Sequence, residues 1–120
     1  MSRLFVQIAT GPENPTRIAL GLLVARGALD SGHEVDVFIA GDGVSVLRPE
    51  TLELANGIGT GSIREHVDAL VAGGARLFAS RLSSNARGIS AESLGGLPVE
   101  LTTPKRLVEL VFEADRTITY

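Results

Sequence analysis

Short apolar and β-branched runs alternate along the whole chain with longer segments in which apolar residues recur at helical spacing. Short runs of this kind, bounded by turn residues, are typical of buried strands. Five segments fit the pattern, and we predict them as strands: residues 4–9, 34–40, 75–79, 98–101 and 116–120.

Four helices are predicted between these strands. Asn14 followed by Pro15 is a typical helix start, and the helical pattern then continues to residue 30, before Ser31 and Gly32. Ser62 with Glu65 three residues later forms a capping box, which predicts a helix that ends at 73–74. The other two helices are expected at residues 49–56 and 104–114, with a shorter helical turn at 90–94.

This alternation predicts the fold class. Strands joined by helices form right-handed crossovers, which give a mostly parallel sheet covered on both faces. We therefore expect an α/β protein, a three-layer α/β/α sandwich around a five-stranded, mostly parallel sheet. No linker or repeat divides the chain, so residues 1–120 are predicted to form a single domain.

In a parallel sheet, ligands usually bind at the edge where the carboxyl ends of the strands meet. Three predicted loops gather there: residues 10–14, 41–43 and 80–87. The candidate site residues on them are Ser80 and Ser83, with Thr10, Gly11, Asp42, Arg81 and Arg87 as possible ligand-binding residues.

Two guanidinium groups beside small hydroxyls would suit a carboxylate, sulfate or phosphate. A small anionic ligand is therefore one possibility for this edge. Solvated loop charges or interface ion pairs would explain Arg81 and Arg87 equally well. For Asp42, a solvated carboxylate in a tight turn is the favoured interpretation.

Composition narrows the function classes. The 120 residues include no cysteine, which excludes disulfides, thiolate catalysis and zinc sites made of cysteine. A net charge of -3 without a basic stripe argues against nucleic acid as a partner. No apolar stretch is long enough for a membrane span or a signal peptide, so a cytoplasmic protein without a membrane partner is expected.

The first helix predicts association between subunits. Residues 18–25 include no polar side chain in eight successive positions, and these positions point in every direction around a helix. One sheet face can bury only one side of such a helix. Harmless exposure of small residues is the alternative, but a mean hydropathy of +0.24 with only 21% charged residues favours a homo-oligomer.

Four blocks of the sequence, in order, resemble the DsrE/DsrF-like family. They are residues 10–17, residues 32–42, residues 86–89 and residues 107–116. The resemblance covers nearly the whole chain. It implies a five-stranded parallel sheet, assembly into trimers or hexamers, and a role in intracellular sulfur transfer.

One loop departs from the family pattern. The resemblance implies a Cys-x-x-Cys element before the segment 86–88, and this alignment places Ser80 and Ser83 at the two thiol positions. A serine hydroxyl stays protonated and cannot hold a persulfide, so persulfide sulfurtransferase chemistry is excluded. The sequence thus predicts a family scaffold without its sulfur-carrying groups.

Other chemistry has little support. His33 precedes the second strand, at the opposite sheet edge from Ser80, and His66 is expected to be a partly exposed surface residue; neither suits a serine triad. No metal-ligand set and no cofactor are expected. The glycine-rich stretch 57–62 could hold a phosphate, although a simple turn capped by Ser62 is favoured.

Three functional hypotheses remain open at this point. The preferred one is an oligomeric accessory or scaffold protein without catalysis of its own, related to intracellular sulfur transfer. The alternative is a small-ligand or anion-binding module that uses the loops at the carboxyl edge of the sheet. An enzyme that uses other residues is the third.

Overall fold

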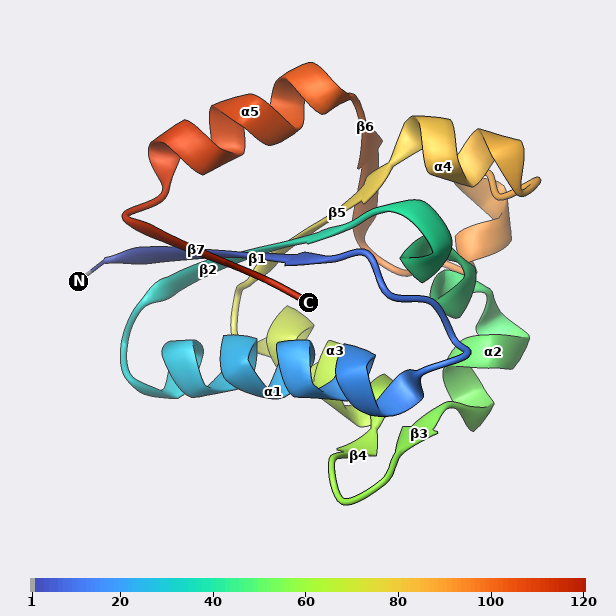
Figure 1. The fold of residues 1–120 in the computed structure, drawn as a ribbon, viewed down its shortest axis with the longest axis horizontal. Coiled ribbons are helices and arrows are strands. Elements are labelled where there is room, and N and C mark those ends of the chain that lie inside the picture. Colours follow the sequence, from blue (N-terminus) through green and yellow to red (C-terminus); the bar gives the residue numbers. More distant parts are fainter. Residues whose placement is uncertain (1) are drawn as a thin grey trace.

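A five-stranded parallel sheet with strand order β6-β5-β2-β1-β7 forms the centre of the protein in the computed structural model, which describes residues 2–120. The helices lie on both faces of this sheet (Figure 1). The elements of the sheet are β1 (Arg3–Ile8), β2 (Glu34–Ile39), β5 (Arg76–Ser80), β6 (Val99–Thr102) and β7 (Arg116–Thr119). The other elements are α1 (Pro15–Asp30), η1 (Gly41–Leu47), α2 (Pro49–Leu54), β3 (Asn56–Gly57), β4 (Gly61–Ser62), α3 (Ile63–Ala72), α4 (Arg81–Ala86), η2 (Glu92–Leu94) and α5 (Pro104–Glu113).

The predicted α/β fold with a five-stranded parallel sheet is confirmed. Each predicted strand is present, with ends shifted by one residue at most. The predicted caps also form, because the Asn14 Oδ1 accepts a hydrogen bond from Arg17 N at 3.2 Å and the Ser62 Oγ accepts one from Glu65 N at 3.2 Å. These local signals were sufficient because a cap depends only on residues within one helical turn.

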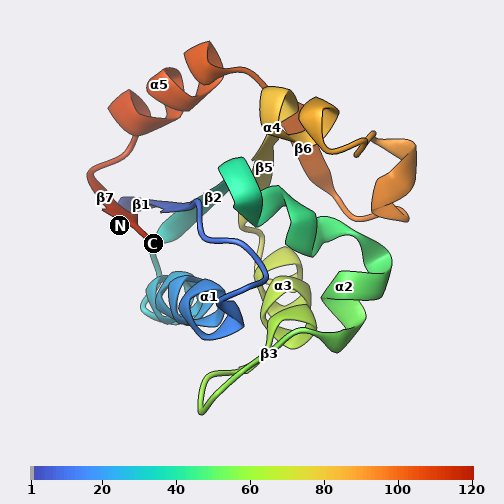
Figure 2. The ribbon, with the colours of Figure 1, turned by 45° about the vertical axis from the view of Figure 1, so that its right-hand side comes forward.

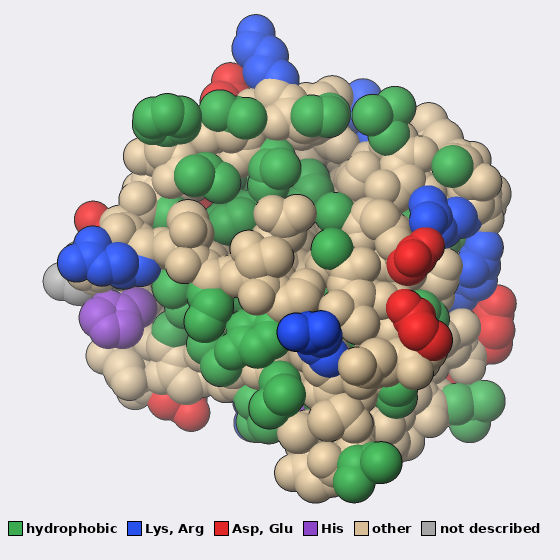
Figure 3. Space-filling model, viewed as in Figure 1, with side chains coloured by type: hydrophobic (Ala, Val, Ile, Leu, Met, Phe, Trp, Pro, Cys, Tyr) green, Lys and Arg blue, Asp and Glu red, His purple; other side chains and the backbone are tan. Residues whose placement is uncertain are grey.

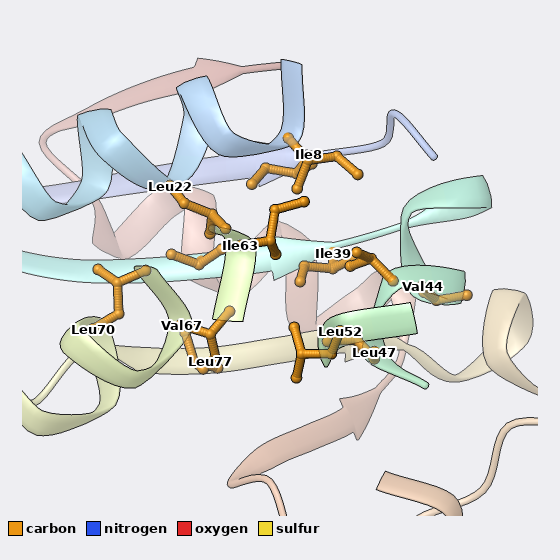
Figure 4. Packing of buried hydrophobic residues seen from close by; sticks show 14 of the residues in the cluster. Ile8, Leu22, Ile39, Val44, Leu47, Leu52, Ile63, Val67, Leu70 and Leu77 are labelled. Carbon is orange, nitrogen blue, oxygen red and sulfur yellow. The ribbon is translucent and has the colours of Figure 1, made fainter. Parts of the chain in front are cut away.

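The larger hydrophobic core lies between the sheet and the layer formed by α1, α2 and α3 (Figures 1 and 2). This core includes Ile8 and Ile39 from the strands, Leu22 from α1, and Ile63 and Leu70 from α3 (Figure 4). All five side chains are buried. This layer fixes the strands, and hence the loops that leave them.

The opposite face of the sheet has a smaller core under α5. Phe5, Phe38 and Phe78 form a row across three neighbouring strands, and Leu110 packs on them from α5. The ring centroids of Phe5 and Phe38 are 6.3 Å apart, and those of Phe38 and Phe78 are 6.4 Å apart. Such distances are typical of favourable aromatic pairs.

A buried carboxylate lies on the same face as this aromatic row. Asp36 is fully buried in β2, and its oxygens accept hydrogen bonds from Arg3 Nη1 at 3.0 Å and from Arg76 Nε and Nη2 at 2.7 and 2.8 Å. Hydrogen bonding to Asp36 raises the pKa of Arg76 above its ordinary value. Two guanidinium groups thus compensate one buried charge, which lies at the amino end of the sheet.

Three segments differ from the predictions. Residues 41–43 do not form a simple tight turn but begin η1, which is held by the buried residues Val44, Val46 and Leu47. The segment 80–87, expected to be a loop, contains α4. Residues 56–62 form a small antiparallel hairpin of β3 and β4.

The prediction that His66 is partly exposed is wrong. Its ring is buried between α1 and the β3–β4 hairpin, with Nδ1 3.0 Å from Arg26 Nη1 and Nε2 2.6 Å from Thr60 O. Because a guanidinium only donates and a carbonyl only accepts, Nδ1 accepts from Arg26 and Nε2–H donates to Thr60. His66 is therefore a neutral structural residue. His33 lies before β2, as predicted, at the opposite sheet edge from Ser80.

The apolar run in α1 is mostly covered by the fold. Five of its eight residues are buried, whereas Leu20 and Leu23 are 42% and 39% exposed. No helix among residues 2–120 is both long enough and apolar enough to cross a membrane.

Candidate functional site

The three loops predicted to meet at the carboxyl edge of the sheet do meet there. The Arg87 Nη2 lies 2.6 Å from the Asp42 Oδ1, which joins the segment after β5 to the segment after β2. A β-carbon built on Gly11 would lie 2.8 Å from the Asp42 Cβ, so the loop after β1 also reaches this point. The structure thus brings the predicted candidate residues to one edge.

Ser80 ends β5 and caps α4. Its Oγ accepts a hydrogen bond from Ser83 N at 3.1 Å, which satisfies one of the free N–H groups in the first turn of that helix. The side chain is half-buried. Its hydroxyl oxygen therefore has a structural role.

Ser83 links two loops. Its Oγ accepts a hydrogen bond from the backbone N–H of Gly41 at 2.9 Å. Gly41 has a φ of 56°, a left-handed conformation that favours glycine, and it begins η1 directly after β2. The Ser83 hydroxyl thus holds the start of η1 against α4.

Arg87 is held from several sides. Its Nη1 donates to Ser83 O at 3.0 Å and its Nη2 to Asp42 at 2.6 Å, while Arg48 Nη2 donates to the Arg87 carbonyl at 2.6 Å. The Asp42 side chain is 70% exposed. The expectation of a solvated Asp42 thus holds for its exposure, but the carboxylate also forms an ion pair.

Arg81 differs from Arg87 in its partners. It is exposed, and its Nη2 donates to the carbonyl of Leu101 in β6 at 3.0 Å. Among residues 2–120, no carboxylate lies within ion-pair distance of its guanidinium. An incoming anion would therefore meet Arg81 without first displacing an acidic side chain.

The first loop contributes backbone rather than reactive side chains. Thr10 is half-buried and Gly11 is buried, and the Gly11 N–H donates to the Glu13 Oε1 at 3.1 Å. Glu13 was predicted at this edge only as part of the loop 10–14 and not as a candidate site residue, and Arg48 was not predicted here. Arg48 is a common surface residue type, and only its long-range hydrogen bond to the Arg87 carbonyl shows where it lies. The Glu13 contact is local, with Gly11 two positions away.

No histidine activates the two serines at this edge. Neither histidine lies at this edge, so Ser80 and Ser83 have no imidazole base within reach. Ser84 is buried beside them, but its Oγ has no hydrogen-bond partner among the described residues. In the same part of the chain, no three His, Asp or Glu side chains gather as metal ligands would.

A comparison with protein families shows which family the chain belongs to. The model of the DsrE/DsrF-like family matches residues 2–120. The chain belongs to this DsrE/DsrF-like family. Membership places it in a family related to sulfur relay and confirms the resemblance stated from the sequence.

Solved structures show the same fold. The ychN protein from E. coli is 20% identical, with a TM-score of 0.83 over 100% of both chains. The protein of unknown function MTH1491 from Methanobacterium thermoautotrophicum is 18% identical, with a TM-score of 0.78 over 100% of both chains. The protein BT1422 from Bacteroides thetaiotaomicron is 12% identical, with a TM-score of 0.75 over 99% of this chain and 95% of its own. No curated protein matches the sequence.

Proposed function

We propose that this DsrE/DsrF-like protein is a cytoplasmic homo-oligomer that acts as a non-catalytic accessory or scaffold subunit in intracellular sulfur transfer. One observation carries the proposal: the hydroxyls at both positions assigned to family cysteines form hydrogen bonds that hold the local fold. Ser80 caps α4, and Ser83 binds the N–H of Gly41.

The chemistry of these groups supports the proposal. Sulfur relay requires a sulfur atom that can be attacked and can leave again, which a thiolate provides. A serine hydroxyl ionises far above neutral pH and needs a neighbouring base to react. Since Ser80 and Ser83 lack such a base, the protein keeps the fold and the surfaces of a relay protein without its reactive groups.

Intact-mass spectrometry tests the absence of relay chemistry. The purified protein is incubated with a low-molecular-weight persulfide donor, and we expect its mass to stay unchanged. A stable increase of about 32 Da, the mass of one sulfur atom, would contradict the proposal.

Two variants make the negative result informative. In Ser83→Cys or Ser80→Cys, a thiol replaces a hydroxyl in the segment that carries Arg81 and Arg87, and nearby positive charge would favour the thiolate. We expect these variants to gain the sulfur adduct faster than the control Ile58→Cys, whose position is 88% exposed at the tip of the β3–β4 hairpin. Equal rates in all three variants would show that this loop is not an adapted sulfur site.

The second candidate function is an anion-binding module at the same edge. It is favoured by Arg81, whose guanidinium is exposed and has no carboxylate partner among residues 2–120. Thermal shift with sulfate in the millimolar range tests it, with Arg81→Gln as the binding variant and the exposed Arg17→Gln as its control. Stabilisation by sulfate that Arg81→Gln abolishes and Arg17→Gln keeps would favour this function over the scaffold.

A further inference from the structure

The strand β7 leaves one edge of the sheet open. It pairs with β1 on one side, and no strand among residues 2–120 lies on its other side. All four of its residues are exposed. Proteins usually protect such an edge with charges, proline or a bulge, yet residues 117–119 have neither charge nor proline.

The hydrogen bonds between β7 and β1 show which backbone groups of β7 have no partner in the sheet. Tyr120 N donates to Gln7 O at 2.8 Å, and Ala9 N donates to Tyr120 O at 2.9 Å, so Tyr120 faces β1. Because the bonding side alternates along a parallel strand, Ile118 also faces β1. The N–H and C=O groups of Thr117 and Thr119 therefore point to the open edge.

One side of α5 extends the apolar surface above this edge. Arg106 and Glu113 lie on the side of α5 toward β5, where Arg106 lies over the Phe78 ring at 5.8 Å and Glu113 pairs with Arg76. Helical geometry puts the opposite side of α5 toward β7. That side carries exposed apolar residues: Val108, Val111 and Phe112, the last of which is 85% exposed.

The helix below the edge is apolar as well. A β-carbon on Gly21 would lie 3.1 Å from the Tyr120 ring, which shows that this side of α1 lies beside β7. Val24 and Ala28 follow on the same side, and the exposed Leu20 lies next to them. Figure 3 views this face and shows hydrophobic side chains above over α5 and below over α1.

We propose that a second copy of this chain binds here, with the two β7 strands antiparallel about a twofold axis at Ile118. In this register Thr117 faces Thr119 of the partner subunit, and the reverse pair forms by symmetry. All the outward N–H and C=O groups of Thr117 and Thr119 are then used, in two hydrogen-bonded pairs. The sheet becomes continuous across ten strands, and α5 packs on α5 and α1 on α1.

The charges of the strand fit this register. Arg116 is the only charged residue of β7, and an axis at Ile118 places it opposite Tyr120 of the partner subunit, on the same sheet face. The two Arg116 side chains are thus kept apart, and each guanidinium can lie against an aromatic ring. A stable interface covers about 800 Å² of each partner. That is a modest share of the 5990 Å² surface of one subunit.

Disulfide trapping tests the position of the axis, because the chain has no cysteine of its own. In Ile118→Cys, the two thiols would face each other in a non-hydrogen-bonded antiparallel pair, where β-carbons are about 4.5–5.5 Å apart. Diamide takes up two electrons and two protons from the thiols, is reduced to its hydrazine, and leaves one S–S bond. We expect rapid dimer formation in Ile118→Cys and only slow dimer formation in the control Ile58→Cys. Equal rates would overturn the proposal.

A proline substitution in β7 gives a second test of the proposed dimer. Thr119→Pro removes an N–H that points outward and is not bonded to β1, and proline is tolerated at such edge positions. We expect its circular dichroism spectrum to match that of the wild type, while its mass in solution falls by half. Thr119→Ser keeps the N–H and should keep the wild-type mass. An unchanged mass in a folded Thr119→Pro variant would overturn the proposal.

The proposal deepens the homo-oligomer of the proposed function and rests on it, but the two fail separately. A twofold axis requires an even number of subunits, so it fits a hexamer and not a plain trimer. A wild-type trimer in native mass spectrometry would overturn the axis and leave the scaffold function intact. A persulfide adduct would overturn the scaffold function and leave the axis intact.

Discussion

The hydroxyl of Ser83 accepts a hydrogen bond from the backbone N–H of Gly41, over a donor–acceptor distance of 2.9 Å. This contact joins the segment after β5 to the segment after β2, at the edge where relay proteins of this family are expected to carry sulfur. A hydroxyl is well suited to this bond, since oxygen is a stronger acceptor than a thiol sulfur.

Ser83→Ala tests the structural role of this hydroxyl. The variant leaves the Gly41 N–H without its partner in a partly buried place, so we expect the free energy of unfolding to fall by about 1–2 kcal/mol. Urea denaturation measures the change. Ser31→Ala, at an exposed serine whose hydroxyl makes no hydrogen bond within residues 2–120, serves as the control. A loss as small as that of the control would contradict the role assigned to Ser83.

Asp36→Asn tests the buried ion cluster. The amide keeps the size of the side chain but leaves Arg3 and Arg76 without their shared charge, so we expect a loss of about 3 kcal/mol in unfolding free energy. The matched control is Asp68→Asn in the exposed pair with Arg64, where the loss should be below about 0.5 kcal/mol. Similar losses in the two variants would show that burial of Asp36 adds nothing.

The pH dependence of the same cluster follows from the raised pKa of Arg76. A cation whose pKa is higher in the folded protein stabilises it fully below the ordinary pKa, and the effect is lost only as pH rises through the raised value. We therefore expect the difference between wild type and Asp36→Asn to be equal at about pH 7 and pH 9. A difference that shrinks across this interval in urea denaturation would contradict this account.

Two glycines of α1 should respond in opposite ways to alanine. A β-carbon at Gly27 meets no atom within 4 Å, so Gly27→Ala should raise stability by about 0.5–1 kcal/mol through helix propensity. At Gly21, it would lie 3.0 Å from the Ile8 Cδ1 and 3.1 Å from the Tyr120 ring. Gly21→Ala should therefore destabilise the protein. Thermal unfolding of both variants checks the pair, and equal shifts would contradict the packing of Gly21.

His66 should occur as one neutral tautomer. The Arg26 donor and the Thr60 acceptor require Nε2–H with a free Nδ1, which nitrogen NMR distinguishes directly. His66→Phe removes both hydrogen bonds, and we expect a loss of about 2 kcal/mol. His33→Phe, at an exposed position, should be nearly neutral. Observation of the Nδ1–H tautomer would contradict the hydrogen-bond assignment.

Much of the fold was predictable because its signals are local. The short apolar runs that define β1 and β2 reflect strands whose two faces are both covered, so that successive side chains are buried on either side of the sheet. The caps at Asn14 and Ser62 depend on residues within a single turn. The same locality explains the miss at α4, since a six-residue helix with polar residues has no apolar stripe, and its cap at Ser80 looks like any loop serine.

For the candidate site, only its position at the carboxyl edge of the sheet could be predicted. Strand order and crossovers bring the ends of β1, β2 and β5 together, and this follows from the pattern of elements. Which groups touch there does not follow. Arg87 pairs with Asp42 across 45 positions of sequence, and Arg48 reaches the Arg87 carbonyl across 39. Such pairs depend on side-chain reach in the folded chain.

The sequence by itself determined the fold class and the main caps, because periodicity and local hydrogen bonding are properties of residues near one another in the chain. Composition alone established that the chain has no cysteine. Only the tertiary structure decided that His66 is buried and that the serine hydroxyls serve the backbone. It alone also left β7 as an edge strand with no neighbour on one side among residues 2–120. These features depend on which distant segments pack together, and packing is fixed by the summed burial of the whole core rather than by any one stretch of residues.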